Sequence, residues 1–143
     1  MQSDVLRQFF LRDQFARHAG IELIDAGPGC ATARMALGPQ HLNGLGTVHG
    51  GAIFTLADFT FAVAANSHGP ASVAINVSIS FLKAAKAGTL EAVAREIQVN
   101  PRLGHYTVDV RDESGQLIAV FNGMAYRKKE SILPPKPPAS TAA

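Results

Sequence analysis

The 143-residue sequence has one cysteine, no tryptophan and few charged side chains. Because Cys30 has no second cysteine to pair with, an internal disulfide is excluded, and we expect a small buried side chain in a reducing cytoplasm. No basic, apolar and cleavage-site pattern of a secretory signal opens the chain, which favours the same location. The most apolar segment, after Gly51, contains Asp58, so we expect no membrane span.

The charges that are present are nearly balanced. Thirteen Lys and Arg stand against eleven Asp and Glu, scattered along the chain, so we expect no nucleic-acid partner. Their scarcity suggests that a partner subunit covers part of the surface. No His, Cys, Asp and Glu cluster has metal-ligand spacing, and no glycine-rich nucleotide loop is present, so we expect neither a metal nor another cofactor.

The length fits a single domain, expected over residues 1–128, followed by a proline-rich tail at 129–143 that we expect to be disordered. Ser3 is a candidate cap for an N-terminal helix running to about His18. Segment 38–48 is rich in turn-forming residues and predicts a loop. The β-like segments are 21–26, 30–36, 73–81, 89–99, 105–112 and 117–127.

From His49 to about Asn66 the chain lacks proline and is apolar on nearly all sides, which predicts a buried helix. Such a helix needs a sheet wrapped around it. An antiparallel sheet of about five to six strands around one long buried helix (about 49–66) is the α+β arrangement called the hotdog fold. Periodicity alone also permits other α+β folds.

The segment 43–67 contains a spaced set of residues: Asn43, the run His49, Gly50 and Gly51, the run Leu56, Ala57 and Asp58, and the pair Asn66 and Ser67. This set resembles the signature of PaaI-like acyl-CoA thioesterases of phenylacetic acid degradation, a hotdog family. The resemblance weakens but continues through most of 20–127. It implies hydrolysis of an aryl-acetyl-CoA, such as phenylacetyl-CoA or a hydroxylated relative, by a homodimer that pairs into a homotetramer.

Thioester hydrolysis needs hydrogen-bond donors where the carbonyl oxygen becomes negative, and a base or nucleophile. The backbone N–H of Gly50, at the positive end of a helix, is the expected oxyanion donor, and Gly51 lets substrate approach the backbone. Asp58, in an apolar helix, is the expected base or nucleophile. Asn43 is expected to donate to the carbonyl or hold the water, and His49 to orient either group.

Gly50 and Asp58 lie eight residues apart, which in a helix separates them by about 12 Å. One thioester carbonyl therefore cannot meet both groups in the same chain, so we expect the site to straddle two subunits. Lys83 and Arg102 are candidate contacts for the phosphates of coenzyme A. Both are more often solvated surface charges.

Other interpretations stay open at this stage. Hotdog domains also act as hydratases or dehydratases and as non-catalytic acyl-CoA sensors, so the fold alone does not select hydrolysis. The adjacent Ser67 and His68 lack the strained glycine-flanked turn of a serine nucleophile, and we discard that pair. Phe59 and Phe61 are expected in the core, with a place in an aromatic acyl pocket as the alternative.

Overall fold

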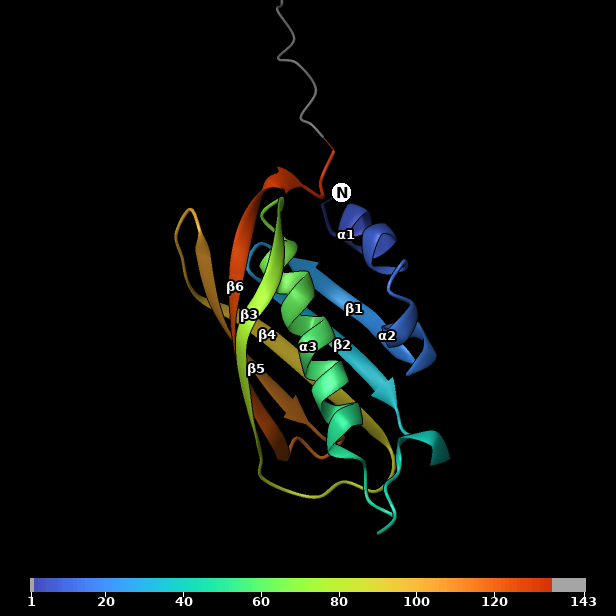
Figure 1. Cartoon of the computed structure of the whole chain (residues 1–143). Helices are drawn as coiled ribbons and strands as arrows, with labels where there is room; N and C mark the ends of the chain where they lie inside the picture. The colour runs from blue at the N-terminus through green and yellow to red at the C-terminus, as the bar shows by residue number, and fades with distance from the viewer. Residues whose placement is uncertain (1, 135–143) are drawn as a thin grey trace, which may run out of the picture.

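The computed structural model describes residues 2–134 as two short helices, a six-stranded sheet and one long helix (Figure 1). The elements are α1 (Gln2–Phe10), α2 (Gln14–His18), β1 (Ile21–Gly27), β2 (Cys30–Ala36), a 3-10 turn (Pro39–His41), α3 (Gly50–Asn66), β3 (Pro70–Phe81), β4 (Thr89–Val99), β5 (Leu103–Arg111) and β6 (Leu117–Ser131). The strand order is β1-β2-β4-β5-β6-β3, and every neighbouring pair is antiparallel. The expected α+β architecture, with the sheet around a long helix, is confirmed.

Helix α3 crosses one face of the sheet and forms the centre of the core (Figure 1). The strand residues that face it alternate with exposed ones, and in β2 and β4 several of them are alanines, including Ala33, Ala92 and Ala94, all fully buried. Small side chains let the helix backbone approach the sheet closely. The two aromatic residues expected in the core, Phe59 and Phe61, are both buried.

Several sequence expectations differ from the structure. The N-terminal helix is two helices, because the Asp13 side chain accepts a hydrogen bond from the backbone of Ala16 (3.0 Å) and starts α2 anew. Cys30 is exposed, since it opens β2 on the outer face of the sheet. Strand β6 continues to Ser131 by pairing with β3, so residues 129–131 belong to the sheet and not to a tail. The rest of the predicted tail, from 135, lies outside the described residues. Strand β5 begins at Leu103, two residues before its expected start, and strand β3 begins at Pro70, three residues before its expected start.

Two surfaces beside α3 are left uncovered in the single chain. Beyond the first turn of α3, the residues that are not fully buried are Phe54, Thr55, Asp58 and Ala62, which lie on one face of the helix at spacings of three or four. The second surface is edge strand β3, whose apolar residues Val73, Ile75 and Phe81 are 43%, 54% and 53% exposed. No helix within residues 2–134 is long and apolar enough to cross a membrane.

Candidate active site

The start of α3 offers one backbone donor to a ligand. His49 occupies the N-cap position, and its Nδ1 accepts the hydrogen bond of the Gly51 N–H at 2.8 Å. The Gly50 N–H has no acceptor among residues 2–134, so it remains available at the positive end of the helix dipole. The two glycines therefore differ in their hydrogen bonds. The Gly50 N–H is unpaired among the described residues, whereas the Gly51 N–H donates to the His49 imidazole. The orienting role expected for His49 stays a prediction, because its ring is seen to hold only the Gly51 N–H.

The missing side chain at Gly50 makes room for an aromatic ring. A Cβ at Gly50 would lie 3.1 Å from Cζ of Phe81, which is closer than ordinary contact. Phe81, at the end of β3, therefore lies directly beside the α3 start. The sequence predicts a strand at Phe81 but no place in the site, because only the register of the sheet brings its ring to Gly50.

Asn43 shapes the loop that leads into α3. Its amide nitrogen donates to Thr47 Oγ1 (2.9 Å), and its Oδ1 accepts the backbone N–H groups of Leu45 (2.9 Å) and Thr47 (3.2 Å). The structure records no contact of this side chain with Gly50, His49 or Asp58. Asn43 therefore holds the loop in shape. Its expected role in binding the carbonyl or a water would need the second hydrogen of its amide group, since the first is donated to Thr47.

Asp58 lies half-buried on the uncovered face of α3. Burial raises the pKa of its carboxyl above the ordinary value, and the negative charge of Asp13 raises this pKa further. A raised pKa makes the ionised carboxylate a stronger base. The sequence did not predict that Asp13 influences the site. The capping position of Asp13, three residues before Ala16, could have been recognised from the sequence.

Within one chain, the structure keeps Asp58 away from the Gly50 donor. Eight residues of regular helix separate them, a rise of about 12 Å. No hydrogen bond among residues 2–134 links Asp58 to the α3 start. A site shared by two subunits is expected only if α3 is unbroken, and α3 is continuous from Gly50 to Asn66.

The two candidate phosphate contacts lie at opposite ends of α3. Strand β3 runs antiparallel to the helix: Phe81 contacts the α3 start, and Ser72 is hydrogen-bonded to Asn66 at the α3 end. Lys83, just after β3, is at the Gly50 end, where its Nζ donates to Gln116 Oε1. The Arg102 carbonyl accepts from the Arg127 backbone (2.7 Å), and Arg127 pairs with Ser72, so Arg102 lies at the far end.

A hollow of about 430 Å³ adjoins the first turns of α3. Its lining includes Phe15 and His18 of α2, together with Gly51, Phe54 and Thr55 of α3. The hollow is mainly apolar. Gly51, which lines it, directly follows Gly50, whose N–H is unpaired. The contribution of α2 could not be found by motif, because α2 lies outside the segment that carries the signature.

No group of three or more His, Cys, Asp and Glu side chains within residues 2–134 is arranged to hold a metal ion. The side chains of Ser67 and His68 both form hydrogen bonds to other residues, and not to each other. The Ser67 hydroxyl donates to the Ala64 carbonyl (2.7 Å) and accepts the Gly29 N–H (2.7 Å), and His68 Nε2 bonds Glu96 (2.8 Å).

Comparison with known proteins agrees with this geometry. The model of the family described as "Thioesterase superfamily" matches residues 45–119. A putative esterase of Archaeoglobus fulgidus is 40% identical over 119 residues, which cover 79% of this chain and 77% of that protein. The acyl-coenzyme A thioesterase PaaI of Escherichia coli is 37% identical over 116 residues, covering 80% and 83%. The solved structure of E. coli PaaI, from the phenylacetic acid degradation operon, is 33% identical with a TM-score of 0.86, covering 92% and 99%. The chain therefore belongs to the thioesterase superfamily, as a PaaI-like member with the hotdog fold.

Proposed function

We propose that this protein hydrolyses acyl-CoA thioesters at a site shared by two subunits. The observation that carries the proposal is the unpaired Gly50 N–H at the start of a helix that also carries the half-buried Asp58. Similarity to the acyl-coenzyme A thioesterase PaaI of E. coli supports the reaction class. Two copies of α3 packed antiparallel would bring Asp58 of the partner subunit to the Gly50 donor.

The uncovered surfaces of the single chain support this pairing. The exposed face of α3 carries Phe54, Thr55, Asp58 and Ala62, and the neighbouring edge strand β3 exposes apolar side chains. An unpaired strand edge is a template for pairing with another chain. Joining two β3 edges by a two-fold axis would continue the sheet and lay the two α3 helices side by side. The homodimer, and its expected pairing into a homotetramer, are part of this proposal.

The reaction follows from the charges at such a site. Thioester hydrolysis places negative charge on the carbonyl oxygen, and the Gly50 N–H would donate to it. The Asp58 carboxylate would either take a proton from water while the hydroxyl adds to the carbonyl carbon, or attack that carbon itself to form an anhydride that water then opens. In both routes the carbon–sulfur bond breaks and the thiolate of coenzyme A leaves. The raised pKa of Asp58 favours its action as a base.

The substrate within this class is the finer part of the proposal. The hollow beside Gly51, lined by Phe15 and Phe54, suits an apolar acyl group such as phenylacetyl or a hydroxylated relative. Lys83 lies at the α3 start of its own chain, whereas Arg102 lies at the α3 end and would approach the α3 start of an antiparallel partner. Both are proposed phosphate contacts. We also propose a cytoplasmic location.

A panel of CoA esters, assayed for release of free thiol with a disulfide reagent, tests the reaction directly. We expect thiol release, with phenylacetyl-CoA or a hydroxylated relative preferred over short and medium aliphatic esters. A hydratase would consume an enoyl-CoA without releasing thiol, and a sensor would bind without turnover. Either of these results would refute the proposed reaction.

A mixing experiment tests the shared site. Asp58→Asn chains and Asn43→Ala chains are each expected to be nearly inactive alone. In a mixed dimer, one of the two sites combines the intact Asn43 loop of one chain with the intact Asp58 of the other, so mixing should restore part of the activity. If unfolding and refolding the two variants together restores no activity, although mixed dimers form, the two residues act within one chain.

A further inference from the structure

His41 is a buried polar residue that the proposed reaction does not use. It ends the 3-10 turn between β2 and α3 and is only 3% exposed. Its Nδ1 accepts the N–H of Gly38 at 3.0 Å, and its Nε2 donates to the carbonyl of Ala19 at 2.6 Å. The roles of the two nitrogens follow from their partners, because a backbone N–H only donates and a carbonyl only accepts. The imidazole therefore joins its own turn to a residue 22 positions earlier in the chain.

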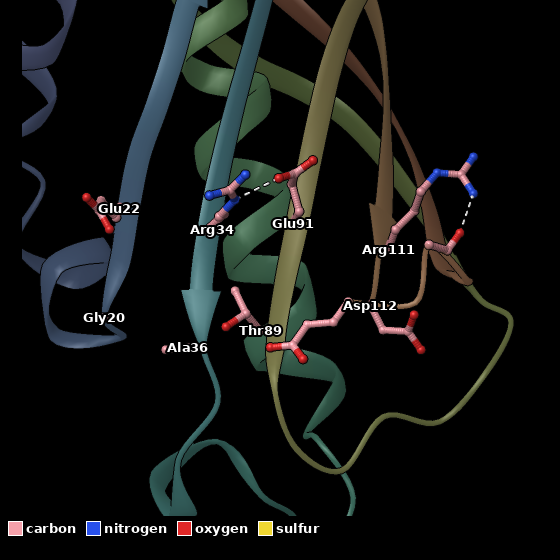
Figure 2. A pocket seen from close by; sticks show the side chains of 10 residues that line it. Gly20, Glu22, Arg34, Ala36, Thr89, Glu91, Arg111 and Asp112 are labelled. Carbon is pink, nitrogen blue, oxygen red and sulfur yellow. Dashed lines mark hydrogen bonds and ion pairs between the residues drawn. The ribbon is translucent and has the colours of Figure 1, made fainter.

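The pairing of β1 with β2 brings these two segments together. Ile21 of β1 lies opposite Met35 of β2, so the chain enters β1 and leaves β2 at the same end of the sheet. Figure 2 shows Gly20 and Ala36 at this end, with α3 behind the strands. The carbonyl that His41 binds belongs to the residue before Gly20. The turn that leads to α3 is thus placed within reach of the end of α2.

The bond to Ala19 is important because α2 is too short to be stable alone. Isolated helices of fewer than about 12 residues are marginal in water, and α2 has five residues. Asp13 caps its first turn, whereas the last carbonyl groups of a helix need partners from elsewhere. The His41 ring supplies such a partner at the C-cap residue of α2. Each end of α2 is therefore held by one side chain.

The backbone of His41 holds the start of α3. Its carbonyl accepts the N–H of His49 at 2.7 Å, and His49 is the N-cap residue directly before Gly50. The loop between the two histidines is closed on itself, because Leu42 pairs with Val48 in an antiparallel bridge. A displacement of His41 would therefore be passed to the residue that caps α3, beside the proposed oxyanion donor.

The hollow of about 430 Å³ lies between the two helices that His41 connects. Its lining combines Phe15 of α2 with Phe54 of α3, and His41 itself is part of it. The shape of the hollow thus depends on where α2 lies relative to α3. The same placement determines how strongly the charge of Asp13 acts on Asp58.

We propose that His41 is a positioning residue that fixes α2 against the start of α3 and so sets the shape of the acyl hollow. This inference rests on the proposed function, because it takes the hollow to receive the acyl group. No hydrogen bond within residues 2–134 joins the ring to Gly50 or Asp58, so His41 acts through the segments that it holds. Loss of its two hydrogen bonds should therefore affect esters that fill the hollow more than esters too short to reach it.

Hydrogen exchange on two variants of nearly equal size tests the contact. His41→Gln offers an amide that can accept from Gly38 and donate to Ala19, and glutamine at this position of a capped turn accepts the N-cap N–H in the capping box. His41→Met has the same length but neither group. His41→Met should exchange the α2 amides of Arg17 and Ala19 about tenfold faster, with parental rates in β4 and β5. His41→Gln should exchange as the parent does.

Kinetics with two esters tests the effect on the hollow. The aromatic acyl group of phenylacetyl-CoA would fill the hollow, whereas acetyl-CoA is too short to do so. His41→Met should lower kcat/KM for phenylacetyl-CoA by about tenfold, mainly through KM, and change the value for acetyl-CoA little. His41→Gln should keep the parental ratio of the two values. Tyr106→Phe is the matched control, because it removes another hydrogen bond of a buried side chain, the one to Glu96 at 3.0 Å, and should also keep the parental ratio.

The inference is overturned if His41→Met keeps parental exchange rates in α2, or if it lowers kcat/KM equally for both esters. It is also overturned if His41→Gln behaves as His41→Met does, since the hydrogen bonds would then not be what holds α2. If His41→Met does not fold, His41→Asn takes its place, because its Oδ1 still accepts from Gly38 and only the bond to Ala19 is lost. If the parent releases no thiol from any ester, the proposed function fails, and the exchange rates still decide whether His41 holds α2.

Discussion

Replacing Asp58 with asparagine tests the proposed chemistry with the smallest change of shape. The amide has nearly the same volume as the carboxylate, so no cavity is created in the half-buried site on α3. It cannot take a proton from water or attack a carbonyl carbon. Loss of such a group typically lowers the rate by about 10² to 10⁴, which corresponds to about 3 to 5 kcal/mol of transition-state stabilisation. We expect kcat to fall by this amount while the affinity for acyl-CoA is kept.

The change in folding stability caused by Asp58→Asn has a predictable direction. Because burial and the charge of Asp13 raise the pKa of Asp58, the folded state binds the proton more tightly than the unfolded state does. The ionised carboxylate therefore lowers stability at neutral pH, and this cost disappears as the pH falls through the folded pKa towards the unfolded value of 3.8. Asp58→Asn should melt above the parent near pH 7, with the difference shrinking in acid.

The assay combines thiol release with melting curves on the same oligomeric sample. Single-turnover measurements with a saturating ester separate the chemical step from binding. An Asp58→Asn enzyme with near-parental kcat would refute the assignment of base or nucleophile. An equal loss of stability at every pH would refute the account of the raised pKa.

Three further changes test neighbouring groups. Asp13→Asn keeps an oxygen for the α2 cap but removes a charge that raises the pKa of Asp58, so the acid limb of kcat/KM should move to lower pH; an unmoved limb contradicts the coupling. Gly50→Pro removes the free N–H at a position where proline is compatible with a helix start, and should lower kcat by about 10² to 10³. A folded Gly50→Pro oligomer with parental kcat would move the oxyanion donor elsewhere. Gly123→Ala would put a Cβ 2.9 Å from the Phe61 ring and should cost about 1 to 3 kcal/mol in urea unfolding; an unchanged midpoint would show that the core relaxes freely.

The amino-acid sequence by itself determined the central features of this protein. A long apolar segment without proline was enough to predict the buried helix α3, and the alternation of apolar and polar residues predicted the strands of the sheet. The spaced residues from Asn43 to Ser67 identified the family. The separation of Gly50 and Asp58 along one regular helix already predicted a site shared by two chains, since the rise per residue is fixed.

Only the tertiary structure decided which groups surround those residues. Phe81 reaches the Gly50 position through the register of β3, and Asp13 influences Asp58 because α2 packs near α3, contacts that span long stretches of chain. The ion pair between Arg34 and Glu91 is likewise invisible in the sequence, where the two residues are separated by 57 residues. Strand pairing sets such neighbours, and a shift of one residue in any strand would turn its charges into the core.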